Sequence, residues 1–330
     1  MQRNTCILVK INLLATQLQV DVASIFEFDS CMKKAIIDLG TNTFHLLVSA
    51  GRKVLLEERR AVRIGMGGIN SNTITADAEA RAEACLKEYA RLAHLHGAEH
   101  IRAIGTSAFR NAANGVEVAF RLEAATGIPI RIISGEEEAS LIWEGIRSGM
   151  DLGDQKNLLV DIGGGSVEFI LADRHRIFWK KSIETGGQRL LERFTPDDPI
   201  LPEQVKRIDD HLKDELKPLA EPLARYAPSD IIGSSGSFDT ISEIHCHRTG
   251  LLYLPGPETP VTMSSLISIC DELIGKSRSD RMVIPGMIEL RVDMIVVASI
   301  LIRRVLAMHP FRQVRVSGYS LKEGIRATWN

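Results

Sequence analysis

Acidic side chains and glycines interrupt a stretch that otherwise has the pattern of a buried β-hairpin. Residues 158–171 (LLVDIGGGSVEFIL) begin and end with apolar runs, but their centre contains Asp161, three glycines, a serine and Glu168. Successive backbone N–H groups in a glycine turn can bind an anion, and a side chain would block that approach. We therefore expect phosphate oxygens to bind at Gly163, Gly164, Gly165 and Ser166.

The two carboxylates of this hairpin favour a divalent cation beside the anion. Asp161 is not expected to bind phosphate directly, because like charges repel, and Glu168 on the returning strand can come near it. Mg²⁺ is usually held by one or two carboxylates, while phosphates and water complete its coordination. The pattern predicts Mg²⁺-assisted phosphoryl transfer. For a single copy, a purely structural β-turn is the competing interpretation.

A second copy of the pattern lies near the start of the chain. Residues 35–48 (AIIDLGTNTFHLLV) align with 158–171 at a constant offset, so that Asp38 corresponds to Asp161. Each copy predicts a strand, a tight turn and a returning strand. Two copies imply two similar domains and favour a ligand site over an ordinary turn. The first copy adds Asp38 as a candidate metal ligand and four candidate phosphate-binding residues, Gly40, Thr41, Asn42 and Thr43.

Helical and strand patterns alternate along the rest of the chain, which predicts an α/β fold. Composition then limits the function. The net charge of -2 gives no overall attraction to nucleic acid or to an anionic membrane. The longest apolar run, 294–302, is too short to span a bilayer and predicts a core helix within 285–308. Five scattered cysteines without a C-x-x-C pair favour a reducing, cytoplasmic location.

The first 32 residues are expected to be an extension outside the fold. Their apolar run is interrupted by Lys10 and Asn12, and no clean signal-peptide cleavage site follows. Met32 begins MKKAIIDLG, which would be a natural start. We expect a loosely packed, disordered N-terminal segment.

Taken together, the motifs resemble the exopolyphosphatase / guanosine pentaphosphate phosphohydrolase (Ppx/GppA) family. The likeness runs from about residue 33 to 326 through DLGTNTFHLLV, AIGTSAFRNAAN, IISGEEEASLI, VDIGGGSVEFI and SGYSLKEGI. It implies two ribonuclease H-like domains of the actin and sugar kinase superfamily, with a cleft between them. We expect domain I to comprise 33–140 plus 316–330, and domain II to comprise 141–315.

The resemblance also assigns roles to residues outside the hairpins. Glu138, the last acid of SGEEEA, would position the attacking water, and Arg110 would bind phosphate. A helix N-terminus should favour the ionised form of Glu138, which would make it a weak base but a good orienter of water. The competing interpretations are an ordinary acidic helix start for Glu138 and a surface ion pair for Arg110.

The expected activity is Mg²⁺-dependent release of terminal orthophosphate by in-line attack of water. The expected substrates are inorganic polyphosphate, guanosine pentaphosphate, or both. One alternative is a non-catalytic sensor of guanosine tetra- or pentaphosphate, and a less favoured one is a small-molecule kinase of the same superfamily. The 233–240 loop could accept a guanosine base, more polyphosphate, or nothing, and a homodimer is among the assemblies left open. Because the larger members' C-terminal extension is absent, we expect little processivity on very long polyphosphate.

Overall fold

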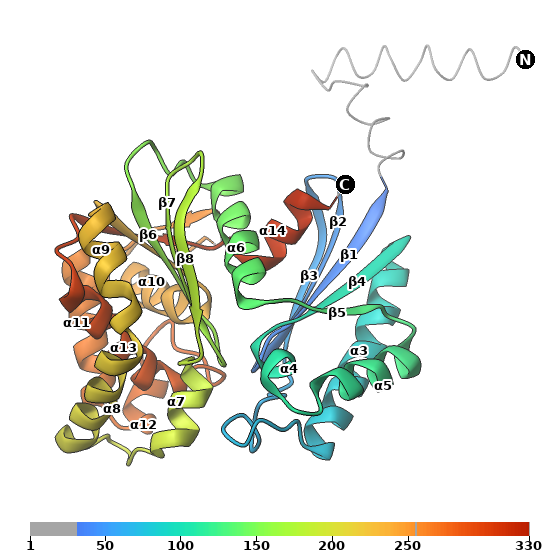
Figure 1. Ribbon diagram of the computed structural model, residues 1–330, viewed down its shortest axis with the longest axis horizontal. Coiled ribbons are helices and arrows are strands. Elements are labelled where there is room, and N and C mark those ends of the chain that lie inside the picture. The colour runs from blue at the N-terminus through green and yellow to red at the C-terminus, as the bar shows by residue number, and fades with distance from the viewer. Residues whose placement is uncertain (1–31, 255, 330) are drawn as a thin grey trace, which may run out of the picture.

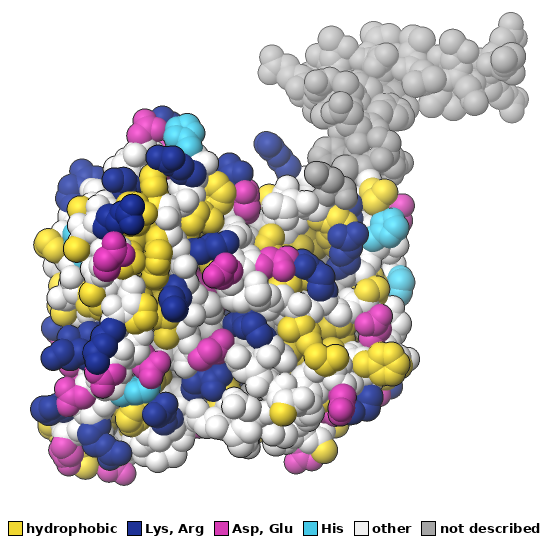
Figure 2. Space-filling view, in the orientation of Figure 1, with side chains coloured by type: hydrophobic (Ala, Val, Ile, Leu, Met, Phe, Trp, Pro, Cys, Tyr) yellow, Lys and Arg dark blue, Asp and Glu magenta, His cyan; other side chains and the backbone are white. Residues whose placement is uncertain are grey.

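The computed structural model describes residues 32–254 and 256–329, so the expected extension, apart from Met32, lies outside the described residues. The described chain forms two lobes, each built on one β-sheet (Figure 1). None of its described helices combines the length and apolar character needed to cross a membrane. Charged side chains of both signs lie along the boundary between the lobes (Figure 2).

The first lobe has a five-stranded sheet in the order β3-β2-β1-β4-β5. Its strands are β1 (Lys33–Leu39), β2 (Thr43–Ala50), β3 (Lys53–Ala61), β4 (His100–Gly105) and β5 (Ile130–Ile132). The first three pair antiparallel, whereas β4 and β5 continue parallel to β1. Its helices are α3 (Ala76–Leu95), α4 (Ser107–Asn111) and α5 (Gly115–Thr126). Helix α3 begins where Thr75 Oγ1 accepts a hydrogen bond from the Ala78 amide.

The second lobe repeats this topology. Its six-stranded sheet has the order β10-β11-β9-β6-β7-β8, so that β8-β7-β6-β9-β11 matches the order of the first sheet. The strands are β6 (Asn157–Ile162), β7 (Val167–Ala172), β8 (Ile177–Ile183), β9 (Asp230–Ser234), β10 (Glu258–Thr259) and β11 (Gln313–Ser317). The helices are α7 (Gly187–Phe194), α8 (Pro202–Glu215), a 3₁₀ turn at Lys217–Leu219, α9 (Ala220–Tyr226), α10 (Gly236–Thr249), α11 (Met263–Gly275), α12 (Arg278–Met282) and α13 (Met294–Met308).

The duplicated hairpins have the same internal register. Asp38 lies opposite His45 in the β1–β2 pair, and Asp161 lies opposite Glu168 in the β6–β7 pair. Each aspartate therefore sits near the end of a buried strand, directly before the turn. The strands β6 and β7 are buried along their whole length, which explains why their sequences are apolar outside the turn. The predicted architecture, two similar α/β domains, is confirmed.

Two helices pack between the sheets and join the lobes through a shared core. Helix α6 (Gly135–Gly149) packs against α14 (Leu321–Thr328), and their apolar residues form one cluster with residues of both sheets. The helices meet at glycines: a Cβ at Gly145 would lie 1.9 Å from the carbonyl oxygen of Ser320, and one at Gly324 would lie 1.7 Å from that of Leu141. The backbones are thus in direct contact. The expected domain limits at 140 and 316 stay a prediction.

The expected helix over 285–308 is wrong in its first part. Residues 285–293 are irregular, and α13 begins only at Met294. Gly286 has a φ of +96°, which a regular right-handed helix does not allow, and the preceding Pro285 lacks a backbone donor. The apolar run 294–302 does lie in a core helix, because α13 is largely buried in the core of the second lobe.

Candidate active site

A pocket between the lobes contains both glycine turns. Its lining includes both candidate phosphate loops, the aspartates that precede them and Glu138, which lies in the first turn of α6. It also includes the start of α10 and the start of α14, so at least five regions distant in sequence meet here. Both candidate phosphate loops thus line the same pocket. Two of the candidate residues, Arg110 and Glu168, lie outside the pocket lining.

The two turns face each other at contact distance. A Cβ at Gly164 would lie 3.1 Å from Thr41 Cβ and 3.2 Å from Asn42 Cγ. One at Gly165 would lie 2.6 Å from Thr41 Oγ1 and 2.4 Å from Ser107 Oγ. Real side chains cannot approach that closely, so this position requires glycine. The glycines are therefore needed for the approach of the two loops as well as for the anion site expected from the sequence.

The first turn presents polar atoms that lack partners. Asp38 Oδ1, Asn42 Oδ1 and Thr43 Oγ1 are buried, and none of them has a hydrogen-bond partner among the described residues. The amide nitrogen of Asn42 instead contacts the sulfur of Met294 from the second lobe. Buried polar groups are normally paired, because leaving one unpaired costs about 1–3 kcal/mol. Such an arrangement suits a site whose partners arrive with a ligand.

Glu138 is buried, with 7% of its surface exposed. Ser134 caps α6 by accepting a hydrogen bond from the Glu137 amide, which places Glu138 in the first turn. Burial raises the pKa of Glu138 to about 7, Arg110 lowers it, and repulsion from Asp161 and Glu184 raises it further. The expectation that the helix N-terminus would dominate and keep this residue a weak base is therefore wrong. Burial has the larger effect.

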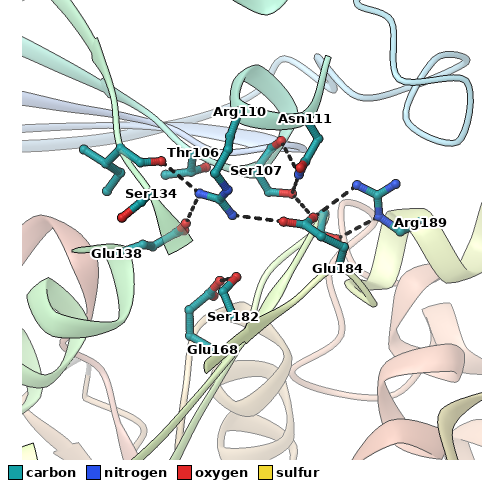
Figure 3. A network of polar contacts seen from close by, with 12 residues as sticks. Thr106, Ser107, Arg110, Asn111, Ser134, Glu138, Glu168, Ser182, Glu184 and Arg189 are labelled. Carbon is teal, nitrogen blue, oxygen red and sulfur yellow. Dashed lines mark hydrogen bonds and ion pairs between the residues drawn. The ribbon is translucent and has the colours of Figure 1, made fainter. Parts of the chain in front are cut away.

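Arg110 holds Glu138 in place and is itself held by a second carboxylate (Figure 3). Its Nη1 donates to Glu138 Oε2 at 2.8 Å and to the carbonyl oxygen of Ile133 at 3.2 Å. Its Nη2 donates to Glu184 Oε1 at 3.2 Å. Glu184 directly follows β8 of the second lobe, whereas Arg110 lies on α4 of the first. The guanidinium thus bridges the lobes, and phosphate binding by Arg110 stays a prediction.

Glu184 continues the network towards the second glycine turn. Its Oε2 accepts hydrogen bonds from Ser107 Oγ at 2.6 Å and from Arg189 Nη2 at 3.1 Å. Arg189 Nε donates to the carbonyl oxygen of Gly165 at 3.1 Å, and its Nη1 donates to that of Ile69 at 3.0 Å. A continuous chain of contacts therefore runs from the buried carboxylate of α6 to the phosphate loop. Sequence reasoning did not identify Glu184, because two of its partners, Ser107 and Arg110, are far away along the chain.

Asp161 is held by three serine hydroxyls. Ser234 Oγ donates to its Oδ2 at 2.6 Å, Ser235 Oγ lies 2.7 and 2.8 Å from its two oxygens, and Ser320 Oγ also donates to Oδ2. Ser235 has a φ of +70°, an unfavourable value for a residue with a side chain. The 233–240 loop thus has a structural role, since it fixes the orientation of the Asp161 carboxylate. Ligand binding by this loop stays a prediction.

Asp38 provides the test of whether a cation fits. Its Oδ1 is one of the unpaired buried atoms, and its pKa is raised to about 8 by burial, with repulsion from Glu138 and Asp161 adding to the effect. A divalent cation would relieve both effects. No group of three or more His, Cys, Asp or Glu side chains among the described residues could hold a metal alone. Asp38 and Asp161 on opposite loops nevertheless fit the one or two carboxylates by which Mg²⁺ is usually held.

Glu168 lies behind the loop. It is 1% exposed, and its Oε1 accepts a hydrogen bond from Ser182 Oγ at 2.7 Å, below the Arg110 network in Figure 3. Burial raises its pKa well above the usual range, and the neighbouring Glu138 and Asp161 add to that effect. Direct metal binding by Glu168 stays a prediction, and its neighbours here are protein hydroxyls.

Two cations of the pocket escaped sequence reasoning. Arg291, in the irregular segment before α13, and Lys322, in the first turn of α14, both line the pocket. Burial lowers the pKa of Arg291, whereas for Lys322 the opposing effect of burial is outweighed by Glu323 and Glu57, which raise its pKa. Gly236 lies against the Arg291 guanidinium, since a Cβ there would approach Nη2 within 2.0 Å. The only sequence signal was their position inside the motifs RVDMIVVA and SGYSLKEGI.

Comparisons with known proteins identify the family of the chain. The sequence matches the Ppx/GppA phosphatase family over residues 47–330. The structure is similar to an exopolyphosphatase from Cytophaga hutchinsonii, with 36% sequence identity and a TM-score of 0.87 over 90% of this chain and 97% of that one. It is also similar in fold to the Aquifex aeolicus Ppx/GppA phosphatase, with 22% identity and a TM-score of 0.70 over 90% of this chain and 99% of that one. The chain therefore belongs to the Ppx/GppA phosphatase family.

Proposed function

We propose that this protein releases terminal orthophosphate from inorganic polyphosphate, guanosine pentaphosphate, or both. The observation that carries the proposal is the meeting of Glu138 with two opposed glycine turns in one pocket. The similarity to an exopolyphosphatase at 36% identity supports polyphosphate as a substrate. The buried, unpaired polar atoms of the first turn support a ligand that brings its own charges and acceptors.

In this mechanism the two turns bind the terminal phosphate and Glu138 binds the water. Glu138 Oε2 is occupied by Arg110, and no described residue donates a hydrogen bond to its other carboxylate oxygen. With a pKa near 7, that carboxylate can accept a proton from water as the water attacks phosphorus in line. Thr43 Oγ1 and the backbone amides of the turns donate to phosphate oxygens.

Mg²⁺ is the proposed cofactor, held by Asp38 and Asp161. When bound, it supplies charge neutralisation at the phosphate oxygens. The serines around Asp161 hold that carboxylate in a fixed orientation whether or not substrate is present, and Arg291 and Lys322 add positive charge to the pocket for the following phosphate groups. Chain-length preference and the choice between the two substrates follow from how those later phosphates are held.

Phosphate release from polyphosphate of defined length in the presence of Mg²⁺ tests the proposal. We expect Glu138→Gln to reduce kcat by about 10²- to 10⁴-fold, the usual range for a lost general base, with an unchanged fold by circular dichroism. Glu137→Gln is the matched control, because the Glu137 side chain is 39% exposed and pairs with Arg131 at the surface. Turnover by Glu138→Gln equal to that of the control would remove Glu138 from the mechanism.

The sensor alternative predicts a different result. A non-catalytic binder would bind guanosine tetra- or pentaphosphate tightly without phosphate release from any substrate. The raised pKa values of Asp38 and Glu138 argue against it, because burying repelling carboxylates beside an anion weakens binding unless they serve a cation or a water. The kinase alternative, the cytoplasmic location and the homodimer stay predictions.

A further inference from the structure

A second cavity lies at the opposite end of α6 from the catalytic pocket. It has a volume of about 720 Å³ and is lined by residues of β1, β2, the β2–β3 turn and the C-terminal parts of α6 and α14. Figure 1 shows where these elements lie. That volume is typical of small-molecule sites. Glu138 and Arg147 are nine residues apart on α6, so a rise of 1.5 Å per residue separates them by about 14 Å along the axis. We call this cavity the basic pocket and define it by Lys34, Arg52, Arg147, Tyr319, Arg326 and Trp329.

The charged side chains that line the basic pocket, as far as the structure describes them, are all cations. None of the described residues that line it is Asp or Glu. Arg147 pairs with Glu144, which lies one turn earlier on α6. Over residues 32–254 and 256–329, Lys34, Arg52 and Arg326 form no ion pair with a carboxylate. Uncompensated charge of one sign in a concave site raises the local concentration of the opposite ion.

Aromatic rings hold these cations without neutralising them. Lys34 Nζ lies 5.3 Å from the ring centroid of Trp329 and donates to its carbonyl oxygen at 2.8 Å. The guanidinium of Arg326 lies 5.8 Å from the ring of Tyr319, and that of Arg102, on β4, lies 4.3 Å from the ring of Trp329. Cation–π contacts fix side-chain positions but leave the full charge available. Lys34 and Arg326 are therefore held in place with their charge available to an anion.

The ligand must carry several negative charges, because the cations come from four separate elements. Arginines bind phosphate in a bidentate manner, and the hydroxyls of Ser49, Ser148 and Tyr319 add further hydrogen-bonding groups to the lining. We propose that the basic pocket binds an oligophosphate, which is either a segment of inorganic polyphosphate or the phosphate groups of a guanosine polyphosphate. The choice of oligophosphates rests on the proposed function, which makes such molecules the substrates of this protein.

Calorimetric titration of the full chain tests the inference. The Glu138→Gln background slows turnover, and inorganic tripolyphosphate and guanosine tetraphosphate are titrated separately. We expect two sites for at least one of these ligands. When the substitutions Arg52→Ala and Arg326→Ala are introduced into this background, the affinity of the second site should fall at least tenfold. The affinity of the first site should stay unchanged. The matched control is Arg207→Ala/Lys213→Ala on α8, which removes two exposed cations from the second lobe, remote from the basic pocket, and should retain both sites.

The outcomes separate this inference from the proposed function. A single site for both ligands, or a second site that Arg52→Ala/Arg326→Ala leaves intact, would overturn the inference. Which ligand fills the second site identifies its source. In an otherwise wild-type chain, we expect Arg52→Ala/Arg326→Ala to keep kcat for tripolyphosphate and to raise KM for long polyphosphate at least fivefold. Failure of the unmodified protein to release phosphate would refute the proposed function, whereas the binding titration would still decide the inference.

Discussion

Glu138 and Glu184 lie at opposite ends of the same guanidinium. Arg110 donates to Glu138 at 2.8 Å from one terminal nitrogen and to Glu184 at 3.2 Å from the other. The first carboxylate is buried in the proposed active site, while the second is contributed by the other lobe and is about one-third exposed. The position of the proposed water-binding carboxylate thus depends on how the two lobes are held together.

Removing the charge of Glu184 should impair turnover without unfolding the protein. We expect Glu184→Gln to lower kcat about tenfold, or about 1.4 kcal/mol, because Arg110 loses one of the groups that orient it. Repulsion from Glu184 contributes to the raised pKa of Glu138, after burial and repulsion from Asp161. The acid limb of kcat/KM against pH should therefore move to lower pH.

The pH profile distinguishes positioning from a general loss of structure. Glu203→Gln, at an exposed position of α8, is the control and should change neither kcat nor the acid limb. If Glu184→Gln lowers kcat but leaves the acid limb where it was, the electrostatic link between the two carboxylates is absent.

Asp38 should destabilise the protein at neutral and alkaline pH when no cation is bound. Its pKa is raised from 3.8 to about 8 in the folded state, mainly by burial, so its contribution to stability is present below pH 4 and is lost as the pH rises through 8. We expect Asp38→Asn to raise the melting temperature at pH 8 by at least about 2–4 °C, which corresponds to ~1 kcal/mol.

Thermal unfolding at pH 5, 7 and 9 in a chelating buffer measures this effect. The difference between variant and wild type should grow from pH 5 to pH 9. Added Mg²⁺ should raise the melting temperature of the wild type more than that of Asp38→Asn, because a ligand that binds only the folded state stabilises it. An equal response of both proteins to Mg²⁺ would exclude Asp38 as a metal ligand.

Gly165 should tolerate no side chain. A Cβ at this position would lie 2.4 Å from Ser107 Oγ and 2.6 Å from Thr41 Oγ1, so Gly165→Ala must separate the two turns. We expect at least a 10²-fold loss in kcat/KM, since displacements of about 1 Å in a catalytic site have effects of that size.

Gly275→Ala provides the comparison for Gly165. Gly275 ends α11, and no atom lies within 4 Å of a Cβ built there. Phosphate release by Gly275→Ala should equal that of the wild type. Near-normal activity of Gly165→Ala would show that the two turns need not approach as closely as they do here.

The hairpins were predictable because their signal is local. Apolar runs, an aspartate and small turn residues repeat within fourteen positions, and the register of Asp38 with His45 and of Asp161 with Glu168 follows from that spacing. The capped start of α6 was equally visible in Ser134 and the glutamates that follow it. Pro285 and Gly286 were also visible in the sequence. The prediction of a helix from residue 285 was wrong because it did not take these two residues into account.

The protonation state of Glu138 could not be predicted from the local sequence. A helix N-terminus favours a carboxylate, but α14, almost two hundred residues later, and the second sheet bury this one. Glu184 and Arg291 were missed for the same reason, since each contacts partners that are adjacent only in the folded chain. Composition and spacing predict which residues can do chemistry, whereas long-range packing sets their protonation and charge.

The glycine contact between α6 and α14 restricts how the lobes can move apart. With backbone against backbone at Gly145 and Gly324, sliding one helix along the other would drive main-chain atoms into carbonyl oxygens. We therefore expect any relative motion of the lobes to be a rotation about this crossing point and not a translation along the helices. A rotation of that kind would break contacts far from the crossing, such as the one between Arg189 and Ile69.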